Sequence, residues 1–218
     1  MKYAVIGATG YVGRAVVAEL ARRGHQVVAF VRDTSKPLDG DGVQMEALDV
    51  SNPVFAERLK GFDAVVSAFN PGWSNPDIAA DFTRGYDAIL STARAAAVPY
   101  LLVVGGAGSL YVAPGVQLVD TPDFPKEIHA GADAARKLLD TLRQQPDLNW
   151  AMVSPPALLG VTGGYSEART GQYRLGKDEL LMAGDAPAGI SVADLAIAIA
   201  DDVEKKAHLR QRFTVASA

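Results

Sequence analysis

Apolar runs of strand length alternate with longer segments of helical periodicity along most of this 218-residue chain. The expected strands are apolar at consecutive positions, so that both of their faces would be buried. They cover residues 2–7, 25–32, 43–50, 63–69, 100–106 and 148–155. Strands that are apolar on both faces are typical of a parallel sheet with helices on each side. The pattern therefore predicts an α/β fold with a doubly wound parallel sheet.

Segments between these strands have the features of helices. The main helices are expected over residues 11–23, 77–97, 126–145 and 192–206. Ser191 to Asp194 has the form of a capping box ahead of the last of them. Ser51 is expected to cap a short helix that runs to Gly61, and residues 212–217 are expected to form a closing strand.

After residue 156 the pieces become shorter and richer in glycine. We find no internal repeat and no second set of core elements. The chain is therefore predicted to be one domain, 1–218, in which residues 157–218 form a small elaboration on the substrate side.

Composition excludes several classes of function. The chain has no cysteine, and its three histidines are scattered without the spacing of metal ligands, so no metal site is expected. A formal net charge of −4 gives no reason to expect nucleic acid as a partner. We see neither a signal peptide nor an apolar run long enough to span a membrane, and the expected location is cytoplasmic.

Three glycines separate the first expected strand from the first expected helix, in the order Gly7, Gly10 and Gly13. Gly7 would permit a tight turn, Gly10 would let the backbone approach a pyrophosphate, and Gly13 would let helix and strand pack closely. The start of the helix would then face the anion. The predicted cofactor-binding residues of this loop are Gly7, Thr9, Gly10, Tyr11, Val12 and Gly13.

The ends of the next strands would complete a dinucleotide site, because parallel strands all present their carboxyl ends to one edge. Arg32 could pair with the 2′-phosphate of NADP, although Asp33 beside it would favour NAD if Arg32 only faces solvent. Asp49 and Val50 are expected to contact adenine. Ala68 and Phe69 would run beneath the ribose and pyrophosphate. NADP(H) is therefore expected in preference to NAD(H).

Six motifs together resemble the atypical short-chain dehydrogenases and reductases, in particular the small NAD(P)H-binding proteins grouped as NADH-flavin reductases. These motifs are GATGYVG, FVRD, ALDV, VVGGAGSL, LNWAMVSPP and RTGQYRLG, and the resemblance extends over essentially the whole chain. It implies a Rossmann fold with NADP in the cleft. Similar proteins include flavin and biliverdin reductases, epimerases and redox-sensing regulators.

The usual catalytic signature of that family is absent from its usual place. Typical members carry Tyr-x-x-x-Lys on the helix after the fifth strand, and the lysine lowers the pKa of the tyrosine. Here that helix contains no tyrosine. The spacing does occur at Tyr173 and Lys177, but without a helical pattern around it, which indicates coincidence. Tyr173 could still line the substrate pocket.

Other residues are candidates for the chemistry. Ser109 could reach a substrate carbonyl or could simply satisfy loop amides, and His129 could donate a proton or lie on the surface. Asn70, Trp73 and Pro155 are expected in the substrate pocket, where Trp73 would face a flat aromatic substrate. Arg169 and Arg174 could attract an anionic substrate such as FMN or could face solvent.

Three functions fit these observations. The first is a reductase of a flavin, a quinone or a similar conjugated acceptor, for which no tyrosine acid is needed. The second is a catalytically silent NADP(H)-binding sensor that reports redox state to a protein partner. A sugar-nucleotide epimerase or dehydratase ranks lowest, because it needs the missing tyrosine.

Overall fold

The computed structural model describes residues 1–218 and contains one large sheet of eight strands. Their order is β10-β14-β8-β5-β4-β1-β2-β3, and every neighbouring pair is parallel except β10 with β14. The strands of this sheet are β1 (Lys2–Ile6), β2 (Gln26–Val31), β3 (Val43–Ala47), β4 (Ala64–Ser67), β5 (Leu101–Val104), β8 (Trp150–Ser154), β10 (Tyr173–Gly176) and β14 (Gln211–Ser217). The predicted doubly wound α/β fold is confirmed.

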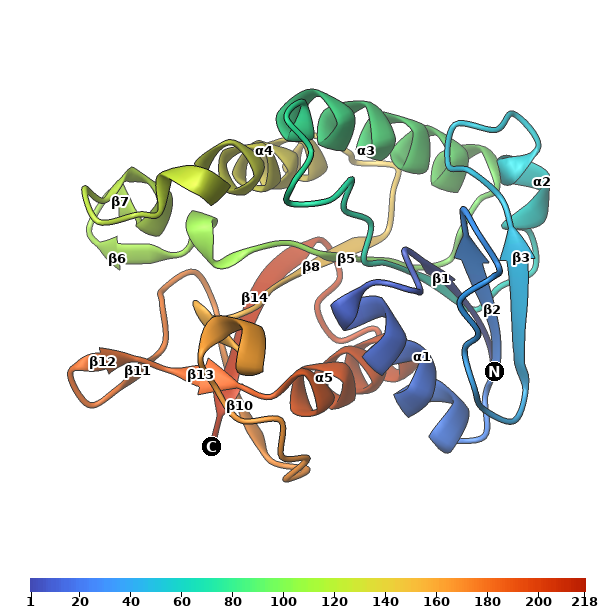
Figure 1. The fold of residues 1–218 in the computed structure, drawn as a ribbon. Helices are drawn as coiled ribbons and strands as arrows, with labels where there is room; N and C mark the ends of the chain where they lie inside the picture. Colours follow the sequence, from blue (N-terminus) through green and yellow to red (C-terminus); the bar gives the residue numbers. More distant parts are fainter.

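Helices cover both faces of this sheet (Figure 1). The helices α3 (Ile78–Ala95) and α4 (Lys126–Arg143) pack on one face, and α1 (Tyr11–Arg22) and α5 (Val192–Lys205) pack on the other. The single-turn helix α2 (Phe55–Arg58) contacts α3.

Alternation along each strand divides the core into two layers. In β1, Tyr3 and Val5 join the core beneath α1 and α5, whereas Ala4 and Ile6 join the core beneath α3 and α4. Successive strand side chains point to opposite faces, so a strand buried on both sides must be apolar at every position. This explains why the central strands have nearly continuous apolar sequences.

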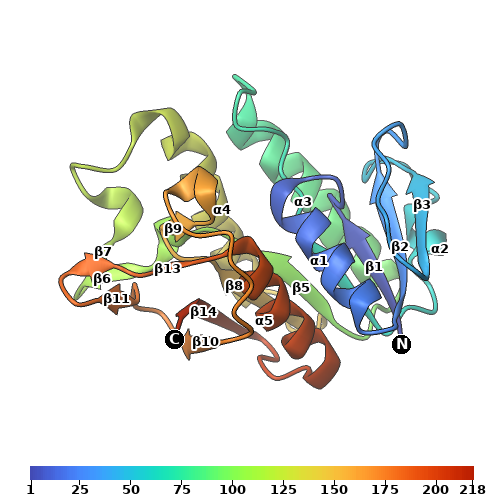
Figure 2. The same cartoon turned by 60° about the horizontal axis from the view of Figure 1, so that its bottom comes forward.

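The C-terminal part of the chain contributes to this same sheet. β14 pairs with β8 and α5 packs against α1, while the antiparallel β10 forms the edge (Figure 2). Smaller strands form three two-stranded sheets outside it. They are β6 (Tyr111–Ala113) with β7 (Val116–Gln117), β11 (Met182–Ala183) with β12 (Ala186–Pro187), and β9 (Leu158–Leu159) with β13 (Gly189–Ile190).

Two predicted helix caps have different outcomes. The Ser191 hydroxyl accepts a hydrogen bond from the Asp194 amide at 3.0 Å, which confirms the cap of α5. The cap at Ser51 is wrong, since its hydroxyl donates to Asp49 at 2.6 Å and α2 begins only at Phe55. The Asp49 carboxylate captures Ser51 in a local turn, and such side-chain turns compete with helix formation.

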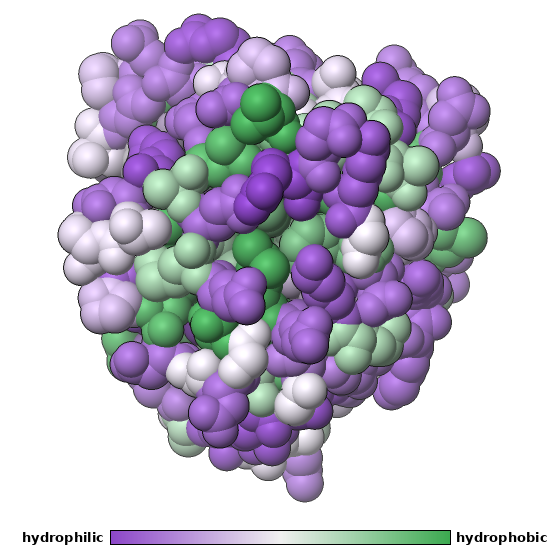
Figure 3. Space-filling model, turned by 90° about the vertical axis from the view of Figure 1, so that its right-hand side faces the viewer, coloured by the Kyte–Doolittle hydropathy of each residue, from purple (hydrophilic) through white to green (hydrophobic).

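The face of the molecule in Figure 3 is largely hydrophilic, with hydrophobic residues gathered toward its centre. Three short 3₁₀ turns complete the fold, namely η1 (Ala107–Ser109), η2 (Leu118–Asp120) and η3 (Val161–Gly163). None of the helices is both long enough and apolar enough to cross a bilayer.

Candidate cofactor and substrate site

A cavity of about 950 Å³ lies at the carboxyl ends of six parallel strands. Its walls come from the segments that follow β1, β2, β3, β4, β5 and β8, together with η2 and the first turns of α4. Ligands of open α/β sheets bind at this edge of the sheet. The position of the cavity is therefore that of a Rossmann-type cofactor site.

The glycine-rich loop forms one wall of this cavity, and its shape lets a ligand come close to its backbone. Gly7 has a φ of +73°, and a Cβ there would lie 2.5 Å from the Ala68 carbonyl oxygen. Gly10 is the N-cap residue of α1, and no side chain caps this helix. A Cβ at Gly10 would lie only 3.2 Å from the Gly7 carbonyl oxygen. The bare backbone and uncapped helix start are what a pyrophosphate requires, so the loop fits a dinucleotide.

The residues of this loop have two separate roles. Gly7, Thr9, Gly10, Tyr11 and Val12 line the cavity, whereas Gly13 does not. A Cβ at Gly13 would lie 2.2 Å from the Gly7 carbonyl oxygen. Gly13 therefore allows α1 to pack closely against the end of β1, and it contributes to the packing beneath the site.

Arg32 is the only cationic side chain that lines the cavity, and it is exposed. Asp33 does not line the cavity, and its carboxylate accepts hydrogen bonds from the Ser35 amide and hydroxyl at 2.8 and 2.5 Å. These bonds lower the pKa of Asp33. The acid that would favour NAD is thus engaged in a turn.

Asp49 and Val50 line the same end of the cavity as Arg32. The Asp49 carboxylate accepts from the Ser51 hydroxyl and from the Ser51 amide at 2.9 Å, and these bonds lower its pKa. Asp49 therefore remains a carboxylate with a fixed orientation.

Ala68 and Phe69 follow β4 and line the middle of the cavity. The Phe69 ring lies against Gly85 of α3, where a Cβ would be 2.2 Å from the ring. It also meets the Tyr86 ring edge-on at 5.7 Å between centroids. The α3 glycine thus makes room for the aromatic side chain that shapes this wall.

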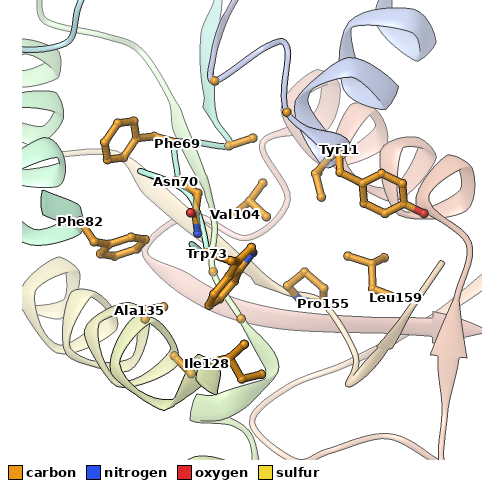
Figure 4. A pocket seen from close by; sticks show the side chains of 18 of the residues that line it. Tyr11, Phe69, Asn70, Trp73, Phe82, Val104, Ile128, Ala135, Pro155 and Leu159 are labelled. Carbon is orange, nitrogen blue, oxygen red and sulfur yellow. The ribbon is translucent and has the colours of Figure 1, made fainter. Parts of the chain in front are cut away.

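Aromatic and aliphatic side chains line the other end of the cavity (Figure 4). Asn70 and Trp73 come from the loop after β4, and the Asn70 side-chain oxygen accepts from the Gly72 amide at 2.7 Å. Trp73 remains 56% exposed, and a Cβ at Gly131 of α4 would lie 2.8 Å from its ring. The residues that surround this end are Phe82, Leu118, Phe124, Ile128 and Pro155. Such walls suit a flat apolar ligand.

The structure places both predicted catalytic residues outside the cavity. Ser109 is only 2% exposed, and its hydroxyl oxygen accepts from the Arg212 guanidinium at 3.2 Å. His129 is exposed and makes an edge contact with Phe124 at 5.9 Å between ring centroids. The cavity face of α4 carries Ile128, Gly131, Ala132 and Ala135, and the helical period turns His129 away from it.

The prediction that Tyr173 lines the pocket is also wrong. Tyr173 lies in β10, and its hydroxyl donates to Asp201 of α5 at 2.6 Å. Burial and this carboxylate raise the pKa of Tyr173. Tyr173 and Lys177 do not share a helix, so their spacing is a coincidence.

The two arginines considered for an anionic substrate are bound elsewhere. Arg169 pairs with Glu19 at 3.2 Å. Arg174 donates to the backbone carbonyls of Ser217 and Met182 at 3.1 and 2.6 Å. Neither arginine lines the cavity.

Sequence reasoning missed a contact across the mouth of the glycine-rich loop. The Tyr11 hydroxyl donates to the Glu167 carboxylate, which also accepts from the Val161 amide at 3.0 Å. Gly160 leaves room for this tyrosine, since a Cβ there would lie 1.9 Å from its hydroxyl oxygen. The segment that follows β8 thereby closes over the start of α1.

Comparison with known proteins agrees with this geometry. A family model described as NAD(P)H-binding matches residues 7–203. The chain belongs to this NAD(P)H-binding family. The predicted resemblance is thus confirmed, and the family assigns a nicotinamide cofactor to the chain.

Full-length relatives share the family's fold. The chain is 39% identical to YwnB of Bacillus subtilis strain 168, covering all of this chain and 99% of the relative. It is 35% identical to a candidate NADH-flavin reductase from Streptococcus pneumoniae, with a TM-score of 0.85 and complete coverage of both chains. It is also 35% identical to a candidate epimerase from Bacteroides thetaiotaomicron, with a TM-score of 0.87 over 99% of this chain and 96% of the other.

Proposed function

We propose that this protein is an NADPH-dependent oxidoreductase that reduces a flavin, a quinone or a similar conjugated acceptor. One observation carries the proposal, namely that a single cavity joins a glycine-rich phosphate cradle to an apolar compartment with aromatic walls. Cofactor and acceptor would lie side by side in such a cavity. The likeness to a candidate NADH-flavin reductase supports the same acceptor class.

The phosphate cradle and Arg32 would hold the cofactor. Backbone of Gly7 to Val12 would bind the pyrophosphate, while Asp49 and Val50 would contact the adenine. Arg32, the cavity's only cation, would pair with the 2′-phosphate of NADPH. Ala68 and Phe69 would support the middle of the dinucleotide. NADPH is therefore proposed as the preferred cofactor.

When bound, the nicotinamide ring supplies a hydride. The chain supplies no evident acid, because the cavity is lined by no histidine, lysine or serine. Tyr11 is its only tyrosine, and burial and the hydrogen bond to Glu167 raise the pKa of its hydroxyl. Flavins and quinones can take the accompanying proton from solvent, so positioning of the two rings would be the main contribution of these residues.

An epimerase would need a proton-transferring tyrosine on the cavity face of α4. That face carries only Ile128, Gly131, Ala132 and Ala135. The chain is therefore similar to the candidate epimerase in its fold, but it lacks the tyrosine that epimerase chemistry would need.

The proposal is tested by NADPH consumption with riboflavin and a panel of small quinones, with NADH in parallel. We expect turnover well above the rate without enzyme, and faster turnover with NADPH than with NADH. A protein that binds NADPH but reduces no acceptor would contradict the proposal and would favour a redox sensor that acts on a protein partner.

A further inference from the structure

The apolar end of the cavity contains one carboxylate and no cation. Asp123 is the only charged side chain there, in the loop between η2 and α4. Arg32 lies at the opposite end, after β2, and the strands β1 and β4 separate β2 from β5. Three strand spacings amount to roughly 14 Å across the sheet. The cation of the cofactor end is therefore remote from the acceptor end.

Three cationic side chains of α4 and β14 are held by carboxylates. Arg136 of α4 pairs with Asp120 at 2.8 Å and also with Asp133. Lys137 pairs with Asp133 at 2.8 Å, and the buried Arg212 pairs with Asp178 at 2.6 Å. None of these three side chains lines the cavity.

The start of α4 also borders this compartment, and it carries one side chain of each charge. Lys126 and Glu127, the first two residues of the helix, are both exposed and neither lines the cavity. Asp123 precedes them by only a few residues. Two carboxylates therefore flank the helix start, where negative charge complements the helix dipole.

On these observations, and resting on the proposed function, we infer that the acceptor is an uncharged conjugated ring system. A phosphate-bearing flavin such as FMN would find no cation lining the cavity to pair with once the cofactor occupies Arg32. It would also place its phosphate near the exposed carboxylate of Asp123, and like charges repel each other. The site therefore selects riboflavin or a neutral quinone over FMN.

Riboflavin and FMN form a matched pair of probes, because they share one isoalloxazine ring and differ by the phosphate. Binding of each oxidised flavin to NADP⁺-saturated protein is measured by quenching of flavin fluorescence. Because this measurement needs no turnover, it is independent of the test of reductase activity. We expect riboflavin to bind at least threefold more tightly than FMN, a ratio in keeping with repulsion across a partly screened site.

Asp123→Asn tests the cause of that ratio, and Asp140→Asn is its matched control. Asp140 lies on α4 with its side chain 65% exposed, and it pairs with Arg143 away from the cavity. We expect Asp123→Asn to bring the two dissociation constants closer together, and Asp140→Asn to leave their ratio as in the wild type.

Tighter or equal binding of FMN in the wild type would overturn the inference, as would failure of riboflavin to bind at all. An unchanged ratio in Asp123→Asn would overturn the role of that carboxylate. Selective binding of riboflavin without any NADPH oxidation would uphold the neutral site but contradict the proposed reductase activity.

Discussion

Among single residues, the proposed preference for NADPH depends most on Arg32. It is the only cation that lines the cavity, while the carboxylate of the neighbouring Asp33 accepts a hydrogen bond from the Ser35 amide. A 2′-phosphate would thus meet a free guanidinium, whereas the ribose hydroxyl of NADH would find no acid ready to accept from it.

We expect Arg32→Ala to weaken NADPH binding about tenfold or more, the usual scale for loss of a hydrogen bond to a charged group, and to change NADH binding little. Fluorescence titration with both cofactors measures this. Arg84→Ala, on the exposed surface of α3, is the control and should alter neither affinity. Equal losses for NADPH and NADH in Arg32→Ala would refute the 2′-phosphate assignment.

Gly7 is the residue whose side chain must be absent. Its positive φ and the 2.5 Å approach of a Cβ to the Ala68 carbonyl both act against any other residue. We expect Gly7→Ala to lower the free energy of unfolding by about 2 kcal/mol and to impair NADPH binding strongly.

Gly106→Ala is a matched control for stability, since its φ is −148° and a Cβ there would meet no atom within 4 Å. Urea unfolding should show Gly106→Ala within about 0.5 kcal/mol of the wild type. The account of the loop fails if Gly7→Ala is as stable as Gly106→Ala.

At the scale of elements, local sequence was enough to predict the parallel strands of the large sheet and the glycine-rich turn, but not the antiparallel β10. Continuous apolar runs can be buried on both faces only in a covered parallel sheet, and β1 shows this alternation between two cores. The turn at Gly7 was equally local, because glycine supplies the required φ itself.

The roles of Ser109 and Tyr173 could not be predicted in this way, because each depends on a partner far away in the chain. Ser109 is bound by Arg212, and Tyr173 by Asp201 of α5. His129 is different, since the spacing of Ile128, Ala132 and Ala135 already marked the cavity face of α4 and excluded it. That spacing can be read from the sequence alone.

The cap of α5 offers a test at this scale. Ser191 is 1% exposed and its hydroxyl accepts from the Asp194 amide, so Ser191→Ala would leave a helix-end donor without its partner. We expect a loss of about 1 kcal/mol in the free energy of unfolding. Ser91→Ala, at an exposed position inside α3, should instead be neutral or slightly stabilising because alanine favours helix. If urea unfolding gave equal effects for the two variants, the cap would contribute nothing.

At the scale of the whole molecule, one charged network ties the two helices of one face to the C-terminal segment. Glu19 of α1 is 5% exposed and accepts from Arg22, Arg23 and Arg169. Arg23 extends the network to Asp201 and Glu204 of α5, at 2.7 and 2.8 Å. The network thereby joins parts of the chain that lie more than a hundred residues apart in sequence.

This network makes stability depend on pH. Burial alone would raise the pKa of Glu19, but hydrogen bonds from the three arginines lower it to about 2. A carboxyl group whose pKa is lower in the folded than in the unfolded state stabilises the folded protein fully at any pH above its ordinary pKa. That contribution disappears as the pH falls toward about 2.

We therefore expect Glu19→Gln to cost about 2 kcal/mol at neutral pH, and this difference from the wild type to shrink as the pH is lowered from about 5 to about 3. Urea unfolding of both proteins across this range measures it. Asp140→Asn is again the control, since its carboxylate is exposed and its pairing is peripheral. A difference that stays constant with pH would show that Glu19 contributes through packing and not through its charge.

The proposed reaction is the transfer of a hydride from NADPH to an acceptor inside this cavity. The most direct test mixes NADPH-loaded protein with riboflavin in the absence of oxygen and follows the absorbance of both. We expect NADPH and oxidised flavin to disappear in a one-to-one ratio, faster than without protein and more slowly with Gly7→Ala. Bound NADPH that leaves the flavin oxidised would contradict it.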